Sequence, residues 1–202
     1  MAIGDWFRRR RPEQRSEVPI SSWLSTYAPT SDAGVTVSQA AAMRVNTVYA
    51  CVSLISKTIA SLPLYVYRED GDSKTPARDH PLWAALHNAP NARMTSFTWR
   101  EIQMAHLLLW GNAYSHIQRD AGAVHLVPLM PWDVTPRLIS GSIVYDVKSN
   151  HGDARRVLSD DMVHVVGLGF DGVCGCSPIT EFARNWLGVA IAGDQHAART
   201  FA

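Results

Sequence analysis

The 202-residue sequence has almost no net charge, few cysteines and no long apolar run. Its formal net charge at pH 7 is +1, whereas proteins that hold nucleic acid through many phosphates carry a clear basic excess. Three cysteines are too few for a disulfide framework in a chain of this length. We therefore exclude a disulfide-stapled secreted domain, and we find no global sign of a nucleic-acid binder.

Membrane and export signals are equally scarce. The longest apolar candidate, MAHLLLWGNAY, falls short of the ~20 residues that span a bilayer and contains His106 and Asn112. The first residues, MAIGDWFRRRRPEQ, place arginines where a secretory signal has its apolar run. Hydrophobic residues make up 47% of the chain, which is ordinary for a globular protein. We expect a soluble protein of the cell interior with a real core and no membrane contact.

The start of the chain differs in composition from the rest. Residues 1–36 combine the arginine cluster at 8–11 and Arg15 with scattered Ser, Pro and Thr, without periodicity. Such a tail can touch nucleic acid or an acidic partner, but a solvated terminus is the commoner role. We predict a flexible basic arm over 1–36 and one folded domain over 37–202. A small nucleic-acid-binding module that uses these arginines remains an alternative.

Helical spacing of apolar residues marks four segments. The first runs from a Ser38 N-cap to a stop at Pro63, and the second covers 81–88. The third begins after Thr95 or Ser96 and ends at Gly111, and the last covers about 178–199. The first segment carries a stripe of Val45, Val48, Tyr49, Val52, Ile55 and Ile59, and the last carries Phe182, Trp186, Val189 and Gly193.

Short strands fill most of the remaining sequence. They are LYVYR, AYSHIQR, VHLVPL, DVTPRL, IVYDVK and MVHVVGL, and tight turn signals separate the last five. Parallel strands need longer crossover connections, so this spacing favours an antiparallel meander. The predicted fold class is α+β, an antiparallel sheet packed with several helices.

The stretch DGVCGCSPITEF at 171–182 is the strongest candidate for chemistry. A structural zinc site needs four ligands, commonly two close pairs, and only Cys174 and Cys176 form such a pair. The glycines lack the lysine of a phosphate-binding loop, and Ser177 lacks the glycine that follows a nucleophile elbow. A thiol- or zinc-dependent hydrolase that uses the two cysteines and a histidine stays open as an alternative.

A structural role explains the same stretch more simply. Ser177 fits an N-cap, Pro178 fits the first helical position, and Glu181 favours the positive end of the helix. His164 lies in an apolar strand, where a half-buried, hydrogen-bonded histidine is commoner than a catalytic base. We therefore name no catalytic, cofactor-binding or metal-ligating residue, and we expect a protein without enzymatic activity that acts in assembly or interaction.

Five segments in order resemble one family, the portal proteins of tailed bacteriophages and prophages of the siphovirus type. The segments are VNTVYACVSLISKTIASLPLYVYR (45–68), HPLWAALHNAPNARMTSFTWRE (80–101), LLLWGNAYSHIQRD (107–120), VHLVPLMPWDVTP (124–136) and DDMVHVVGLGFDGVCGCSPI (160–179). In the last segment, Asp171-Gly172, Gly175 and Ser177-Pro178 look like the family's Asp-Gly…Gly-x-Ser-Pro turn. Cys174 and Cys176 then occupy variable positions of that turn.

The resemblance implies a structural subunit of a ring, normally dodecameric, at one vertex of the capsid. Double-stranded DNA passes through its channel, and the implied partners are the capsid protein, the terminase and head–tail connector proteins, with no cofactor. The location would be the virion, and the host cytoplasm during assembly. Portals of this type are about twice as long, so the chain is either a truncated portal or a partial sequence of one. We expect 37–202 to be most of the outer wing domain, without stem, clip and crown.

Overall fold

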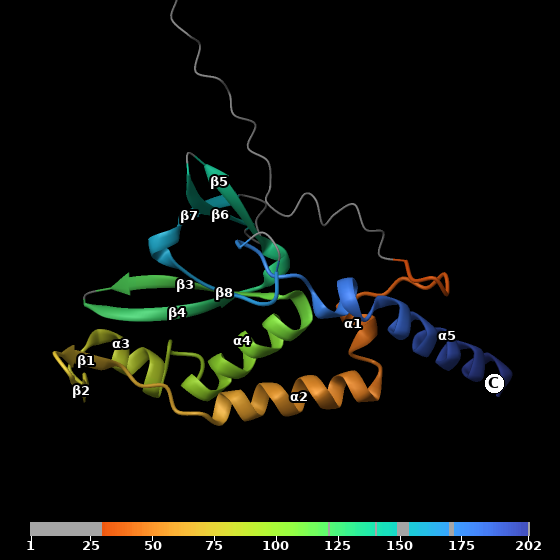
Figure 1. Ribbon diagram of the computed structural model, residues 1–202, viewed down its shortest axis with the longest axis horizontal. Coiled ribbons are helices and arrows are strands. Elements are labelled where there is room, and N and C mark those ends of the chain that lie inside the picture. The colour runs from red at the N-terminus through yellow and green to blue at the C-terminus, as the bar shows by residue number, and fades with distance from the viewer. Residues whose placement is uncertain (1–29, 121, 140, 149–153, 170–171, 202) are drawn as a thin grey trace, which may run out of the picture.

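Two long helices and an antiparallel sheet form the centre of the molecule (Figure 1). The computed structural model describes residues 30–120, 122–139, 141–148, 154–169 and 172–201. Helix α4 (Ser96–Trp110) lies between the sheet on one side and helix α2 (Asn46–Ser61) on the other. The predicted α+β class with antiparallel strands is confirmed. Of the predicted arm, residues 1–29 lie outside the described part of the chain.

The first predicted helix is in fact two helices. Ser38 is the N-cap of α1 (Gln39–Ala42), and its side chain accepts a hydrogen bond from the Ala41 amide at 3.1 Å. The chain then leaves helical geometry, and α2 begins after Val45, which has an extended backbone. The break lets α1 pack on the last helix while α2 packs on α4. A single straight helix could not reach both partners, so tertiary packing overrides the continuous periodicity.

The ends of α4 are as predicted from its sequence. Thr95 is the N-cap, and its hydroxyl accepts from the Thr98 amide at 3.2 Å. Gly111 ends the helix in the left-handed region with φ of 74°, a conformation that residues with a Cβ rarely adopt. The preceding short helix is also confirmed, as α3 (Pro81–Trp83) followed by a π-helical turn over Ala84–Asn88.

The predicted single meander is wrong in its connectivity, because the strands form two three-stranded sheets. The first has the order β4–β3–β8 and the second β5–β6–β7, all antiparallel. Short 3-10 turns before β5 and before β8 redirect the chain, and β8 returns to pair with β3. The strands are β3 (Asn112–Asp120), β4 (Ala123–Leu129), β5 (Val134–Ile139), β6 (Ser142–Lys148), β7 (Ala154–Leu158) and β8 (Met162–Val166).

A separate hairpin projects at the edge of the molecule (Figure 1). It consists of β1 (Tyr67–Asp70) and β2 (Ser73–Pro76), and all eight residues of the two strands are exposed. The strand expected over 64–68 is therefore shifted, because Glu69 and Asp70, which follow the expected strand, pair with β2. Gly71, with φ of 58°, makes the turn itself. The hairpin register, not the apolar content, decides where the strand lies.

The last predicted helix is interrupted once. A π-helical turn over Pro178–Phe182 is followed at Ala183 by α5 (Arg184–Thr200), which extends away from the body (Figure 1). Only the base of α5 is fixed. There Ser31 packs so closely on Gly188 that a Cβ at position 188 would lie 2.1 Å from the Ser31 hydroxyl oxygen. Asn185 also donates to the Asp32 carboxylate at 2.6 Å.

The buried apolar residues form two clusters. One lies among the helices and the other between the two three-stranded sheets. The helical cluster contains Val37, Ala42, Val52, Leu109, Ile179 and Leu187, and the sheet cluster contains Tyr114, Val134, Tyr145, Val157 and Met162.

Candidate functional site

The two cysteines of the candidate stretch are buried in a tight turn. Cys174 and Cys176 form no disulfide within the described residues and are 4% and 2% exposed, whereas Cys51 is exposed on α2. Within the described ranges, no three His, Cys, Asp or Glu side chains converge as a metal site would require. The backbone of Cys176 donates to Leu168 at 2.6 Å, which closes the turn on itself. The geometry supports a structural turn rather than a reactive thiol pair.

Ser177 acts as the predicted N-cap. Its hydroxyl donates to the Leu109 carbonyl at 2.7 Å and accepts from the Thr180 amide at 3.2 Å. Both roles of the hydroxyl are used, and the bond to Leu109 ties this turn to the end of α4. A hydroxyl held in this way is positioned to stabilise two helix ends, and within the described residues it forms no hydrogen bond to a basic side chain that could activate it as a nucleophile.

His164 is half-buried and hydrogen-bonded, as predicted. Its ring stacks on Tyr114 with centroids 4.3 Å apart, and its Nε2 lies 3.0 Å from the side-chain oxygen of Asn112. Its Nδ1 lies 3.3 Å from the Tyr145 hydroxyl. Burial raises the pKa of Tyr145, and the nearby Cys174 adds to this effect. The group joins the two sheets through β3, β6 and β8.

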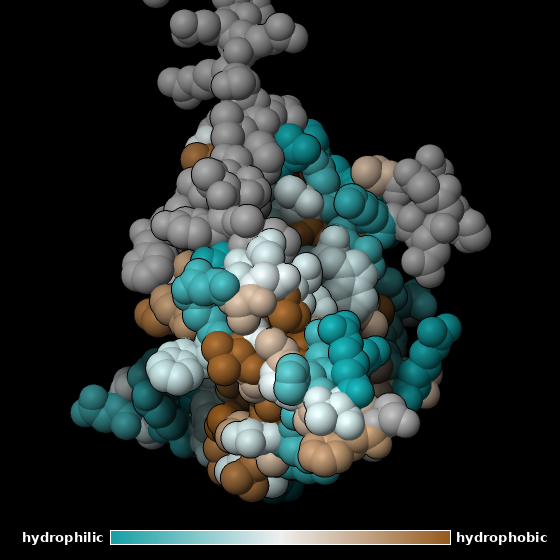
Figure 2. All heavy atoms as spheres, turned by 90° about the vertical axis from the view of Figure 1, so that its right-hand side faces the viewer, coloured by the Kyte–Doolittle hydropathy of each residue, from teal (hydrophilic) through white to brown (hydrophobic). Residues whose placement is uncertain are grey.

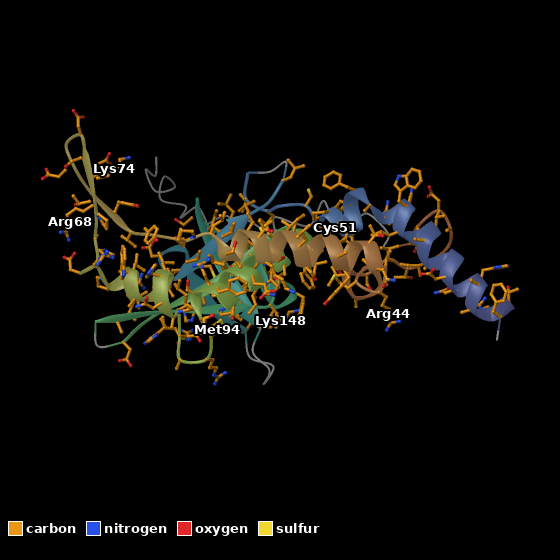
Figure 3. All side chains as sticks on the ribbon, turned by 90° about the horizontal axis from the view of Figure 1, so that it is seen from below. Arg44, Cys51, Arg68, Lys74, Met94 and Lys148 are labelled. Atoms are coloured by element: carbon orange, nitrogen blue, oxygen red, sulfur yellow. The ribbon has the colours of Figure 1, made fainter. Side chains whose placement is uncertain are left out.

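The apolar stripe predicted for the first helix is divided, because Val52 is buried in the helical cluster and Val45 and Val48 pack against it, whereas the other three residues point outward. Tyr49, Ile55 and Ile59 are 55%, 41% and 40% exposed, while the small residues Ser56 and Ala60 are buried. Small side chains at the contact let α2 approach α4 closely, and Arg100 of α4 donates to the Ala60 carbonyl at 2.8 Å. The larger apolar residues are thereby turned to the outer face. Figure 3 shows this helix from below, with Cys51 labelled at its edge.

The stripe predicted for the last helix is also exposed. Trp186 is 82% exposed and Val189 is 61% exposed, while α5 buries only Leu187 and Gly188. Figure 2 looks at this end of the molecule and shows apolar surface gathered in its lower half. Such apolar faces mark interaction surfaces when they are contiguous. Periodicity identified both stripes, but it could not tell which side of each helix the rest of the chain covers.

An apolar cleft of about 590 Å³ lies between α4, β4 and the turn before α4. Its lining includes Met94, Ile102, His106, His125 and Met130. Burial lowers the pKa of His106 to about 4, so its ring is neutral at physiological pH. The ring packs edge-on against Trp110, and within the described chain its Nδ1 has no hydrogen-bond partner. This mainly apolar lining suits the binding of an apolar group.

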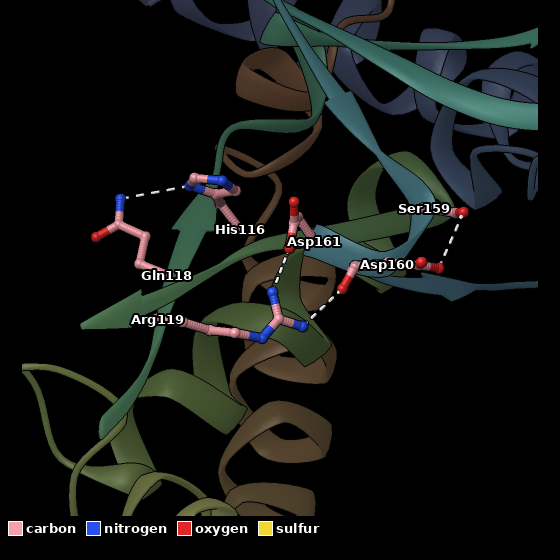
Figure 4. A network of polar contacts seen from close by, with 6 residues as sticks. All are labelled: His116, Gln118, Arg119, Ser159, Asp160 and Asp161. Carbon is pink, nitrogen blue, oxygen red and sulfur yellow. Dashed lines mark hydrogen bonds and ion pairs between the residues drawn. The ribbon is translucent and has the colours of Figure 1, made fainter. Parts of the chain in front are cut away.

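A second, polar cleft of about 390 Å³ lies beside β3 (Figure 4). Arg119 on β3 forms an ion pair with Asp161 and donates to the Asp160 carbonyl at 2.9 Å. On the same strand, Gln118 contacts His116 Nδ1 at 3.3 Å. Sequence reasoning missed this cluster because its residues come from separate strands, and only the pairing of β3 with β8 brings them together.

No helix in the described ranges is long and apolar enough to cross a membrane.

Comparison with known proteins gives a consistent picture. A family model described as phage portal protein matches residues 46–202. The portal protein of Enterobacteria phage HK97 is 33% identical over 166 residues, which cover 79% of this chain and 38% of the relative. The probable portal protein of Streptomyces phage phiC31 is 28% identical over 201 residues, which cover 94% of this chain and 44% of the relative. The chain thus spans less than half the length of these relatives.

A solved structure shares the fold. It is a chain in the neck of a native gene transfer agent particle, determined with C12 symmetry. The TM-score is 0.61 at 18% sequence identity, and the match covers 81% of this chain and 44% of the other.

Proposed function

The chain belongs to the phage portal protein family, and from this premise we propose that it is the wing portion of a portal subunit. The single observation that carries the proposal is the family match over residues 46–202. The same residues contain the cysteine turn, so the family assignment and the structural role of that turn agree. The wing assignment of 37–202, with stem, clip and crown outside it, is part of the proposal.

Ring assembly accounts for the exposed apolar faces. A ring closes through head-to-tail contacts, in which two different surfaces of each copy meet. The outer face of α2 and the exposed stripe of α5 supply apolar area that the described chain leaves uncovered. The relative in the gene transfer agent neck was determined with C12 symmetry, which supports a twelvefold ring as the proposed assembly.

The proposed role is structural and without catalysis. In support, the hydroxyl of Ser177 is held by backbone groups, and His164 is hydrogen-bonded between the two sheets. The proposed partners are further copies of the chain, the capsid protein, the terminase and head–tail connector proteins, with double-stranded DNA in the channel. We place the protein in the virion, and in the host cytoplasm during assembly.

Imaging of the protein from its full natural reading frame tests the proposal. The protein is purified and examined by negative-stain electron microscopy. Rings with a central hole are the expected result. A protein that stays monomeric at high concentration, from the full frame, contradicts the portal assignment of function. Incubating the same preparation with a nonspecific ester and measuring hydrolysis tests the hydrolase alternative, and replacing Cys174 and Cys176 by serine should leave assembly unchanged.

A further inference from the structure

The polar cleft beside β3 carries a positive charge that the described chain does not neutralise. Asp161 is paired with Arg119, whereas Arg155 on β7 lines the same cleft and forms no ion pair within the described residues. Lys148 lies in register with Ala154, next to Arg155 along β7, and is also exposed. Burial, and then the charge of Arg155, lower the pKa of His116. A cationic surface of this kind favours an anionic occupant.

The β1–β2 hairpin carries an excess of negative charge at its tip. Both cations of the hairpin are already in ion pairs. Arg68 binds Asp79 at 2.9 Å, and Lys74 lies 3.6 Å from Glu69. The carboxylates of Asp70 and Asp72, on either side of Gly71, have no cationic partner within the described ranges. The tip of the hairpin therefore presents two uncompensated negative charges.

The hairpin also lacks packing. All eight of its strand residues are exposed, and an isolated two-stranded hairpin is marginally stable in water. Docking of its tip against another surface would order it. Figure 3 shows the hairpin, with Arg68 and Lys74, projecting at one end of the body. The hairpin contributes no residue to the lining of the polar cleft, so the two are separate surfaces of one copy, as a head-to-tail contact requires.

We propose that the acidic tip of the β1–β2 hairpin of one copy docks in the basic cleft of the next copy, where Arg155 binds Asp70 and Asp72. The inference rests on the proposed portal function and adds to it which two surfaces meet. An acidic protein turn suits this cleft better than a nucleic-acid backbone does, because the cleft offers one unpaired cation, Arg155, whereas a nucleic-acid backbone is held through many phosphates. Charge pairs of this kind fix the register of an interface and speed its formation.

Charge reversal tests the contact directly. The full natural reading frame is prepared as wild type, as Arg155→Glu, as Asp70→Lys/Asp72→Lys, and as the combination of all three. Mass photometry measures the fraction of protein in rings against concentration, at low and high salt. Each reversal alone places like charges together and should raise the concentration needed for half assembly by roughly tenfold or more. The combined variant should recover most of the wild-type assembly.

Arg44→Glu is the matched control, because Arg44 is an exposed arginine on the turn between α1 and α2, lines neither cleft and has no ion pair within the described residues. It should neither weaken assembly nor rescue Asp70→Lys/Asp72→Lys. Thermal unfolding of each variant separates a loss of contact from a loss of fold.

A cross-linking experiment gives a second readout that does not depend on charge. In a Cys51→Ser background, Asp72→Cys and Arg155→Cys are combined, and mild oxidation should give a ladder of covalent oligomers. Either single cysteine variant should not give the ladder. The remaining cysteines, Cys174 and Cys176, are buried.

The outcomes are distinguishable. Wild-type rings that are unaffected by both reversals, together with no ladder, overturn the inference and leave the portal function standing. A wild-type protein that forms no rings overturns both. If Arg155→Glu leaves assembly intact but abolishes binding of a DNA duplex in fluorescence anisotropy, the cleft serves nucleic acid and the inference is wrong. Recovery of ring assembly in the triple variant supports the contact, provided that the control variant neither weakens nor rescues assembly.

Discussion

Asn112 and Gly175, which lie 63 residues apart, exchange two hydrogen bonds across the centre of the molecule. The Asn112 side chain donates to the Gly175 carbonyl at 2.7 Å, and the Gly175 amide donates to the Asn112 side-chain oxygen at 2.8 Å. The same oxygen lies 3.0 Å from Nε2 of His164. One asparagine at the start of β3 thus holds the cysteine turn and β8 together.

We predict that Asn112→Ala destabilises the fold by roughly 2–4 kcal/mol, because it removes the side-chain partner of the partly buried Gly175 backbone groups and one hydrogen bond of the His164 ring. Urea unfolding followed by circular dichroism gives the free energy of unfolding. Gln118→Ala is the control, since Gln118 is an exposed side chain with one contact to His116, and it should change stability by less than ~0.5 kcal/mol. Equal effects of the two variants would refute the role assigned to Asn112.

A second prediction concerns the close approach of two backbone segments. A Cβ at Gly175 would lie 2.0 Å from the Gly111 carbonyl oxygen, so Gly175→Ala must push the turn away from the end of α4. We expect a loss of roughly 2–4 kcal/mol of unfolding free energy, or failure to fold.

Gly193→Ala should raise the free energy of unfolding, in contrast to Gly175→Ala. Nothing lies within 4 Å of a Cβ at Gly193 in the middle of α5, and alanine is favoured over glycine there by about 1 kcal/mol. Melting temperatures of the two alanine variants and the wild type check both expectations. A neutral Gly175→Ala would mean that the turn is not packed against α4 in solution.

Local sequence was enough to predict the ends of several elements. Thr95, Gly111 and Ser177 carry their own capping chemistry, so their roles follow from neighbours within a few residues. The α+β class also followed from the spacing of strands and turns. The portal family followed from a resemblance over five segments, which no single motif carried.

The rest depends on contacts between distant segments. Strand β7, with the sequence ARRVL, has one buried residue and no alternating pattern, and only its pairing with β6 defines it. The burial of Ser56 in place of Ile55 depends on how closely α2 meets α4. The polar cleft joins Arg119 and Arg155 from two different sheets, and no spacing in the sequence indicates that they are neighbours.

A third prediction follows from the buried His106. Burial lowers the pKa of His106 from its ordinary 6.5 to about 4 in the folded protein. As pH falls, the unfolded chain binds this proton before the folded protein does, so stability is lost between pH 6.5 and about 4 and is level below that. The loss attributable to this group is at most about 3 kcal/mol.

His106→Leu should flatten the pH dependence of the unfolding free energy in that window, as measured by urea titrations at a series of pH values. His196→Gln, on the exposed face of α5, is the control and should keep the wild-type slope. Asp146 acts in a different range, because its hydrogen bond to Arg156 lowers the pKa of the carboxyl and its contribution is lost only below the ordinary 3.8. If His106→Leu kept the wild-type pH dependence of the unfolding free energy, the pKa of His106 would be the same in the folded and the unfolded protein, and the prediction would be wrong.

The last prediction concerns Trp186, which is 82% exposed on the stripe of α5. Tryptophan is enriched among the residues that dominate binding energy, and this side chain makes little contribution to the core of its own chain. In the full natural reading frame, Trp186→Ala should leave the melting temperature nearly unchanged but weaken ring assembly by about 2 kcal/mol or more per contact. Leu138→Ala, at an apolar residue on β5 that is 52% exposed, is the control and should affect neither. Mass photometry across a concentration series compares the variants, and rings that form as in the wild type would show that this face of α5 is not part of the interface.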